Sequence, residues 1–169
     1  MEQVTPTLSN LAEAALRLAV AHLSSAAHNG GEITLPFPQE PARDCGFAVL
    51  GMGKLGAREL NCSSDIDLVL LYDPGCGVYS ARRGAEAIGG ITSCLARGIV
   101  TLVEARDAAG YVFRTDLRLG PDAAVKLPLF GVSLSWDYYA TDFISPARFF
   151  FSMAMGLKYP RVECSLLAL

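Results

Sequence analysis

Histidine and cysteine are few and scattered in this sequence. It contains two histidines and five cysteines, and no two of the cysteines form a Cys-x-x-Cys pair. An odd number of dispersed cysteines argues against a disulfide framework, and the missing Cys-x-x-Cys pair argues against a zinc knuckle. We therefore expect a protein of a reducing compartment, the cytoplasm.

An excess of positive charge is also missing. The 169 residues include 14 lysines and arginines against 17 aspartates and glutamates, which gives a net charge of -3, and the pI is about 5.3. General nucleic-acid binders usually carry a basic patch or a high pI. The charge balance therefore predicts no nucleic-acid partner.

Secretory and membrane-spanning patterns are absent too. The N-terminus lacks the basic, apolar and small-residue order of a signal peptide, and the longest apolar run near the C-terminus, residues 147–157, is shorter than the roughly 20 residues needed to cross a bilayer. We expect no membrane partner. Apolar residues nevertheless make up 51% of the chain, slightly above the typical value of about 45 to 50%. We therefore expect part of the surface to be covered by another chain or by further polypeptide.

The length fits a single domain with a short extension. Apolar periodicity predicts three helices and three strands along the chain. For the first helix we expect Ser9 as the N-cap, Gly30-Gly31 as the end, and an apolar face made of Leu11, Ala15, Leu16, Leu18 and Leu23. The predicted helices are 8–28, 85–106 and a third near 133–140, and the predicted strands are 46–50, 66–72 and 111–119.

A glycine turn followed by two alternating aspartates is the most informative stretch. It starts at Gly51 and runs through a short polar connection to Asp65 and Asp67 at the start of the 66–72 strand. Side chains at i and i+2 of a strand lie on the same face, about 7 Å apart. Mg²⁺ prefers oxygen ligands and commonly shares them between a few carboxylates and substrate phosphates. By itself an Asp-x-Asp pair more often marks a solvated strand end.

With a third aspartate, Asp116, the pattern favours a metal site over a solvated strand end. In the 111–119 strand, Tyr111, Phe113, Leu117 and Leu119 would share a core face, whereas Arg114, Asp116 and Arg118 would share a charged face. Three carboxylates on neighbouring strands are a compact way to hold the metal ions of nucleotidyl transfer, a reaction that needs mainly positioning and charge neutralisation. The pattern predicts a metal-dependent phosphoryl or nucleotidyl transfer site.

Several polar residues around these aspartates are candidates for phosphate binding. The turn at Gly53 would let backbone N–H groups approach a phosphate, Ser63 and Ser64 would add hydroxyl donors, and Lys54 would add charge. Lys54 fits a solvated loop lysine equally well. Arg114 and Arg118 fit a phosphate site or an ordinary strand surface.

A dinucleotide-binding fold is the main rival interpretation. The spacing Gly51-x-Gly53-x-x-Gly56, with Asp73 twenty residues after Gly53, matches its fingerprint. However, a parallel crossover needs about a dozen residues or more, including a helix. Only nine residues separate Gly56 from Ile66. The connection is too short for that fold.

Several segments at fixed spacing resemble the glutamine synthetase adenylyltransferase family, also called glutamate-ammonia ligase adenylyltransferase. The segments that carry the resemblance are Gly51-Met52-Gly53-Lys54-Leu55-Gly56, Glu59-Leu60-Asn61, Ser63-Ser64-Asp65-Ile66-Asp67-Leu68 and Arg114-Thr115-Asp116-Leu117-Arg118-Leu119. The resemblance implies an α/β fold of the DNA polymerase β-like nucleotidyltransferase type, with an N-terminal helix and a mixed sheet flanked by helices. It also implies that Asp65, Asp67 and Asp116 are the catalytic carboxylates and hold Mg²⁺.

Members of that family carry two related catalytic domains with opposite activities. One uses ATP to adenylylate a tyrosine of glutamine synthetase, and the other removes the AMP by phosphorolysis and releases ADP. The motifs of this chain are more similar to the removing half. The resemblance therefore implies glutamine synthetase, ATP or ADP and phosphate as partners, and a nitrogen-regulatory signalling protein as a partner of the full-length family members.

The chain also departs from the family pattern. Gly120 stands where the family usually has arginine, and the Trp-Glu-Arg and Lys-Ala-Arg segments expected after Tyr138-Tyr139 are missing. We accordingly expect an N-terminal helix and linker in residues 1–42, a nucleotidyltransferase domain in 43–140 and a divergent tail in 141–169. A truncated, non-catalytic remnant of the enzyme is the alternative interpretation.

Overall fold

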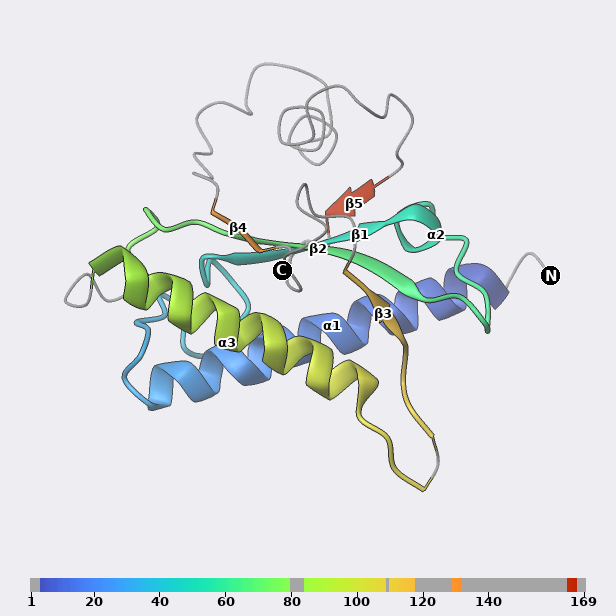
Figure 1. Cartoon of the computed structure of the whole chain (residues 1–169), viewed down its shortest axis with the longest axis horizontal. Coiled ribbons are helices and arrows are strands. Elements are labelled where there is room, and N and C mark those ends of the chain that lie inside the picture. The colour runs from blue at the N-terminus through green and yellow to red at the C-terminus, as the bar shows by residue number, and fades with distance from the viewer. Residues whose placement is uncertain (1–3, 80–83, 109, 118–128, 132–163, 167–169) are drawn as a thin grey trace, which may run out of the picture.

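The computed structural model describes residues 4–79, 84–108, 110–117, 129–131 and 164–166. Within these ranges the chain forms a mixed sheet with two long helices (Figure 1). In chain order the elements are α1 (Val4–Asn29), β1 (Phe47–Met52), α2 (Gly53–Gly56), β2 (Ile66–Tyr72), α3 (Gly84–Glu104), β3 (Thr115–Asp116), β4 (Leu129–Gly131) and β5 (Cys164–Leu166).

The sheet contains both parallel and antiparallel neighbours. Its strand order is β3-β2-β1-β5, and β4 also pairs with β2. β1 pairs antiparallel with β2 and with β5, whereas β3 and β4 both run parallel to β2. The α/β fold with a mixed sheet is therefore confirmed. The dinucleotide-binding alternative fails, because the two strands that flank the glycine turn are antiparallel, and that fold needs them parallel.

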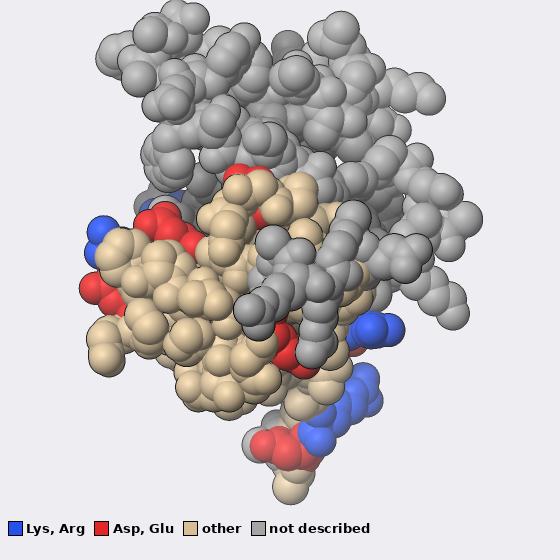
Figure 2. All heavy atoms as spheres, turned by 90° about the vertical axis from the view of Figure 1, so that its left-hand side faces the viewer, with Lys and Arg blue, Asp and Glu red and all other residues tan. Residues whose placement is uncertain are grey.

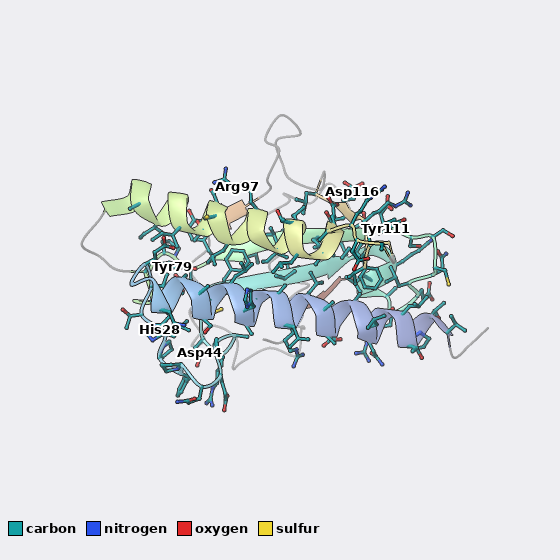
Figure 3. All side chains as sticks on the ribbon, turned by 90° about the horizontal axis from the view of Figure 1, so that it is seen from below. His28, Asp44, Tyr79, Arg97, Tyr111 and Asp116 are labelled. Carbon is teal, nitrogen blue, oxygen red and sulfur yellow. The ribbon has the colours of Figure 1, made fainter. Side chains whose placement is uncertain are left out.

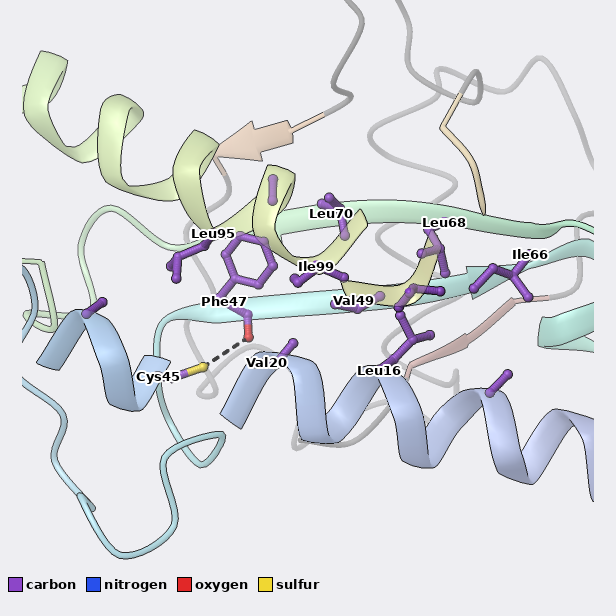
Figure 4. Packing of buried hydrophobic residues seen from close by; sticks show 14 of the residues in the cluster. Leu16, Val20, Cys45, Phe47, Val49, Ile66, Leu68, Leu70, Leu95 and Ile99 are labelled. Atoms are coloured by element: carbon purple, nitrogen blue, oxygen red, sulfur yellow. Dashed lines mark hydrogen bonds between the residues drawn. The ribbon is translucent and has the colours of Figure 1, made fainter. Parts of the chain in front are cut away.

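The main core lies between the sheet and the two long helices. Figure 1 shows α1 and α3 side by side on one face of the sheet. Register places Val49 of β1 opposite Leu70 of β2, and both point toward the helices (Figure 4). Leu16 of α1 and Ile99 of α3 complete this layer, and each of the four is at most 1% exposed. Full burial of one such side chain contributes about 1.5 to 3 kcal/mol.

The opposite face of the sheet is apolar as well. Leu50 and Met52 of β1 alternate with the core-facing residues, as do Val69 and Leu71 of β2, and all four are buried. Strands buried on both faces appear in the sequence as continuous apolar runs. This accounts for the uninterrupted Phe47–Met52 segment and for part of the high apolar content.

The first helix was predicted in the right place, but two of its details were wrong. α1 begins at Val4, so Ser9 is an interior residue whose hydroxyl donates to the Thr5 carbonyl and does not cap the helix. Leu11 and Leu18 are 54% and 72% exposed, and the buried face is formed by residues such as Ala12, Leu16 and Ala19. The helix carries apolar residues on two faces, and periodicity could not tell which one meets the sheet.

The strand predicted over 111–119 is confirmed only in part, because residues 111–114 and Leu117 lie outside any strand. Among the described residues of this segment, Thr115 and Asp116 alone pair with β2. Tyr111 and Val112 are exposed, contrary to the core face expected for Tyr111, whereas Phe113 is buried and its N–H donates to Val103 at the end of α3. Asp107 and Gly110 pair with each other in an antiparallel bridge, and the chain then returns to the end of α3, where Phe113 is bonded to Val103, before it reaches the sheet. Leu119 and the helix predicted near 133–140 lie outside the described residues.

The remaining long elements match the prediction closely. β2 has the predicted bounds, β1 extends two residues past the predicted strand, and α3 covers nearly all of 85–106. By length and composition the stretch Ala87–Glu104 of α3 is apolar enough to cross a membrane. Core helices of soluble proteins pass the same test, and Leu95, Ala96 and Val103 of this helix lie in the core.

Candidate active site

The structure brings Asp67 and Asp116 together on adjacent strands. In the parallel pairing of β2 with β3, Asp67 lies directly opposite Asp116. Their neighbours Ile66 and Thr115 are paired in the same way, and Ile66 points into the helix-side core. Because successive side chains alternate, both carboxylates lie on the face away from α1 and α3. Each is half-buried, and Figure 3 shows Asp116 near the end of α3.

The backbone of Gly53 lies close to one of these carboxylates. It follows β1, whose last residue, Met52, pairs with Asp67. Gly53 has a φ of +52°, and a β-carbon at this position would lie 2.8 Å from Oδ2 of Asp67. Only glycine combines this backbone conformation with such close approach. Gly51, in contrast, belongs to β1 itself and packs against the Leu55 side chain.

Asp65 forms an ion pair with Arg114. The Arg114 Nε lies 2.6 Å from Oδ1 of Asp65, and Nη2 donates a hydrogen bond to the carbonyl of Ser63 at 3.1 Å. Both side chains are about half exposed, at 53% for Arg114 and 44% for Asp65. Exposed pairs of this kind usually contribute about 0.2 to 1 kcal/mol. The contact therefore fixes geometry more than it stabilises the fold.

The polar connection before β2 is held by its own side chains. Asn61 Oδ1 accepts hydrogen bonds from the Ser63 N–H and from the Ser64 hydroxyl. Lys54 Nζ in turn donates to the Ser64 oxygen at 3.3 Å. Lys54, Ser63 and Ser64, predicted as phosphate ligands, therefore form one exposed cluster beside Asp65. Arg118, the remaining predicted ligand, lies outside the described residues.

Three supporting contacts around the site were missed by sequence reasoning. Ser9 Oγ of α1 accepts a hydrogen bond from the Leu60 N–H, which anchors the connection that leads to Asp65. Arg58, with a φ of +61°, pairs with Glu13 of α1 at 3.2 Å. No local signal could have revealed these contacts, because the partners are about fifty residues apart.

The third supporting contact fixes the short strand β3. Oε1 of Glu104, the last residue of α3, accepts hydrogen bonds from the Thr115 N–H at 2.8 Å and from the Thr115 hydroxyl at 2.5 Å. Thr115 immediately precedes Asp116. A helix end therefore sets the position of the carboxylate-bearing strand.

Asp67 and Asp116 provide a donor set of the kind that Mg²⁺ takes. The ion is commonly bound by one or two carboxylates together with substrate phosphates, and carboxylate oxygens are its preferred ligands. Within the described residues, however, no three His, Cys, Asp or Glu side chains are grouped so that they could hold a metal ion. Two of the three predicted ligands face each other across paired strands, and Asp65 is engaged by Arg114.

The other titratable cluster lies at the far end of the molecule. Tyr79 and His28 are placed opposite to Asp116 in Figure 3. Tyr79 donates to the Gly46 carbonyl at 2.6 Å, and burial raises its pKa. Burial also raises the pKa of the Cys45 thiol. His28 contacts the backbone of Ile33 and Leu35 after α1. We interpret this cluster as structural.

One face of the described part of the chain carries both acidic and basic side chains. On the face presented in Figure 2, acidic and basic residues are interspersed among uncharged ones, and the described residues there form no continuous basic patch.

Comparison with known proteins identifies the family. A family model described as glutamate-ammonia ligase adenylyltransferase matches residues 1–142. The chain belongs to the glutamate-ammonia ligase adenylyltransferase family. The match includes α1 and the whole glycine and aspartate motif, as the resemblance of the motifs had indicated.

Individual family members agree with this assignment. The chain is 46% identical over 120 residues to a protein of Rhizobium meliloti, 44% identical over 132 residues to one of Mesorhizobium japonicum and 42% identical over 144 residues to one of Brucella suis. Each is named bifunctional glutamine synthetase adenylyltransferase/adenylyl-removing enzyme. These matches cover 71%, 78% and 82% of this chain but only 12%, 13% and 14% of the relatives. The chain thus corresponds to a small part of the adenylyltransferases that it matches.

Proposed function

We propose that this chain is a nucleotidyltransferase domain that acts on glutamine synthetase, and that it removes AMP from an adenylylated tyrosine by phosphorolysis. The observation that carries the proposal is the pairing of Asp67 with Asp116 beside the close approach of Gly53. The names of the relatives supply the substrate class.

In this proposal the carboxylates of Asp65, Asp67 and Asp116 hold Mg²⁺. The bound ion would supply charge neutralisation at the phosphates and polarise the reacting oxygens. Asp67 and Asp116 sit on one face, and strand pairing fixes their backbones. They are therefore positioned before the substrate arrives, which reduces the cost of assembling the site.

The remaining site residues would bind and orient phosphate. Arg114 carries a planar guanidinium suited to two phosphate oxygens, and Lys54 adds a second positive charge. The Ser64 hydroxyl contacts Lys54 and Asn61 in one exposed cluster, and Ser63 joins this cluster through its backbone N–H. The Gly53 turn exposes backbone to the substrate because it carries no side chain.

The reaction balances without a further co-reactant. An oxygen of inorganic phosphate attacks the phosphorus of the AMP group, and a new P–O–P bond forms as the bond to the tyrosine oxygen breaks. The tyrosine oxygen leaves with the bonding electron pair and takes up a proton, and ADP is released. The residues listed above need only to position the two phosphates and to balance their negative charge.

The direction of transfer is inferred from the motifs. The Gly-Met-Gly-Lys-Leu-Gly, Glu-Leu-Asn and Ser-Ser-Asp-Ile-Asp segments are more similar to the removing half of the family. The relatives are named for both activities, so ATP-dependent adenylylation of the same tyrosine is the second candidate function.

A labelled-phosphate assay tests the proposal. The purified chain would be incubated with adenylylated glutamine synthetase, Mg²⁺ and ³²P-labelled inorganic phosphate. We expect the label to appear in ADP, in step with loss of AMP from the synthetase. Pyrophosphate formed from ATP and unmodified synthetase would instead establish the opposite direction. Absence of both products, with a folded chain, would favour the non-catalytic remnant.

A further inference from the structure

The contact between Asp65 and Arg114 occupies a carboxylate that the proposed site assigns to Mg²⁺. Arg114 Nε lies 2.6 Å from Asp65 Oδ1, and within the described residues no three acidic, His or Cys side chains are grouped for a metal. We infer that Arg114 is an internal counter-ion that holds Asp65 while the metal is absent and is released to bind phosphate when the metal takes Asp65. This inference rests on the proposed function.

Strand register places both groups next to the paired aspartates. β2 and β3 pair Ile66 with Thr115 and Asp67 with Asp116. Arg114 comes one residue before this pairing, and its carbonyl accepts a hydrogen bond from the Ile66 N–H at 2.8 Å. Because side chains alternate along a strand, Arg114 belongs to the face of Asp116. The guanidinium therefore lies beside the paired aspartates both when it contacts Asp65 and when it binds a phosphate.

The Arg114 side chain is held at two points. Besides the ion pair, its Nη2 donates to the Ser63 carbonyl at 3.1 Å. A guanidinium has a rigid, planar set of donors, so two contacts define its position well. Asp65 is consequently directed toward Arg114 while that contact lasts. The polar connection and the start of β3 are joined by this single side chain.

The contact is nevertheless weak enough to exchange. Both side chains are about half exposed, and such pairs are screened by solvent. A divalent ion carries twice the charge of a guanidinium, and carboxylates are its preferred ligands. Once Asp65 turns to the metal, Arg114 loses its counter-ion at the point where a phosphate would arrive. A phosphate offers the bidentate partner that a guanidinium prefers.

The proposed exchange predicts a result that differs from the result expected if Arg114 only positions Asp65. If Arg114 only positioned Asp65 for the metal, its removal would weaken metal binding or leave it unchanged. If Arg114 competes with the metal, its removal strengthens metal binding. The sign of the change in affinity therefore separates the two roles without any measurement of turnover.

Binding of Mn²⁺ alone, followed by electron paramagnetic resonance of the free ion, supplies the test. We expect Arg114→Gln to lower the Mn²⁺ dissociation constant by up to about fivefold, the upper end of the range that corresponds to an exposed ion pair. Arg114→Lys keeps the charge but cannot make both contacts, so it should fall between the wild type and Arg114→Gln. It also serves as the test variant if Arg114→Gln does not fold.

Two control variants complete the design. Arg106, an exposed arginine whose guanidinium lies 5.1 Å from the centre of the Tyr111 ring, makes no ion pair with Asp65. Arg106→Gln removes the same charge and should leave Mn²⁺ affinity unchanged. Asp67→Asn should weaken binding strongly, which shows that the ion is bound at the proposed site.

Each outcome has a definite meaning. An unchanged or weakened affinity in Arg114→Gln overturns the inference while leaving the proposed metal site intact. Equal tightening in Arg106→Gln also overturns it, because the effect would then be general electrostatics. If the wild type and Arg114→Gln both fail to bind Mn²⁺, or if Asp67→Asn binds as the wild type does, the proposed metal site fails and the inference fails with it.

Discussion

A β-carbon on Gly53 would lie 2.8 Å from Oδ2 of Asp67. This distance is shorter than real β-carbons tolerate, and the φ of +52° adds a second constraint at the same residue. The glycine turn and the aspartate motif, which are separate in sequence, are therefore one structural unit. Each restricts the residues allowed at the other.

Replacement of this glycine should damage the site more than the fold. Gly53→Ala is expected to lose about 1 to 2 kcal/mol from its left-handed backbone and also to displace the Asp67 carboxylate. Gly77→Ala is a matched control, since Gly77 has a φ of +75° with open space around it. Thermal unfolding should show similar losses for both variants, but only Gly53→Ala should weaken Mn²⁺ binding. Equal Mn²⁺ affinity in the two variants would contradict this account.

The tether from Glu104 to Thr115 should control the placement of Asp116. Glu104→Ala removes both hydrogen bonds, which at an exposed site contribute about 1 kcal/mol. We expect a small change in stability but a clear loss of ADP release. Glu104→Gln keeps an acceptor oxygen and should recover most of the activity, which a simple charge effect would not allow. Thr115→Val, which loses only the hydroxyl bond, should be intermediate.

The contact between α1 and the polar connection should matter for stability. Ser9 is 2% exposed and its oxygen accepts the Leu60 N–H. Ser9→Ala leaves that N–H without a partner, at a cost of about 1 to 3 kcal/mol. The control is Thr101→Ala, which removes an equivalent hydroxyl-to-carbonyl bond from the exposed side of α3. Urea unfolding should show a loss in Ser9→Ala alone, and equal stabilities would argue against the anchoring role.

Thiol labelling tests the burial of the cysteines in the described part of the chain. Cys62 and Cys94 are exposed and should react first. Cys76 is exposed as well, but desolvation of its thiol raises its pKa, so its labelling should be slower at neutral pH and should accelerate as the pH rises. Cys45 is buried with a raised pKa and should react only on unfolding. Rapid labelling of Cys45 in the native chain would contradict the structure.

The same pKa shifts give the direction of the alkaline stability change. Folding raises the pKa values of Cys45, Cys76 and Tyr79 because burial favours their neutral forms. Their contribution to stability is fully present below the unfolded pKa values, and it is lost as the pH rises toward the folded ones. We therefore expect the midpoint of urea unfolding to fall as the pH is raised above about 8.5, the usual cysteine pKa.

The sequence was most informative where the structural signal is local. β2 begins and ends as predicted because its apolar run is bounded by Asp65 and by the Pro74-Gly75 turn. α3 was recognisable from apolar spacing even though it contains several glycines. The motif likewise predicted that Asp67 and Asp116 lie on neighbouring strands, and the structure pairs them directly.

What the sequence could not supply depends on contacts between distant residues. The choice of buried face in α1 is made by the sheet, so Leu11 and Leu18 were wrongly placed in the core. β4 and β5, each of three residues, carry too few residues for a periodic signal. The ion pair of Asp65 with Arg114 requires the register between two strands that are about fifty residues apart.

ADP release by the wild type and by Asp67→Asn, measured side by side, tests the central claim most directly. Asp44→Asn is the matched control, because Asp44 is exposed at the opposite end of the molecule (Figure 3) and its φ of +49° is well tolerated by asparagine. We predict that the wild type and Asp44→Asn release ADP from adenylylated glutamine synthetase with phosphate and Mg²⁺, and that Asp67→Asn is slower by at least about 100-fold. Equal rates for Asp67→Asn and the wild type would contradict the account.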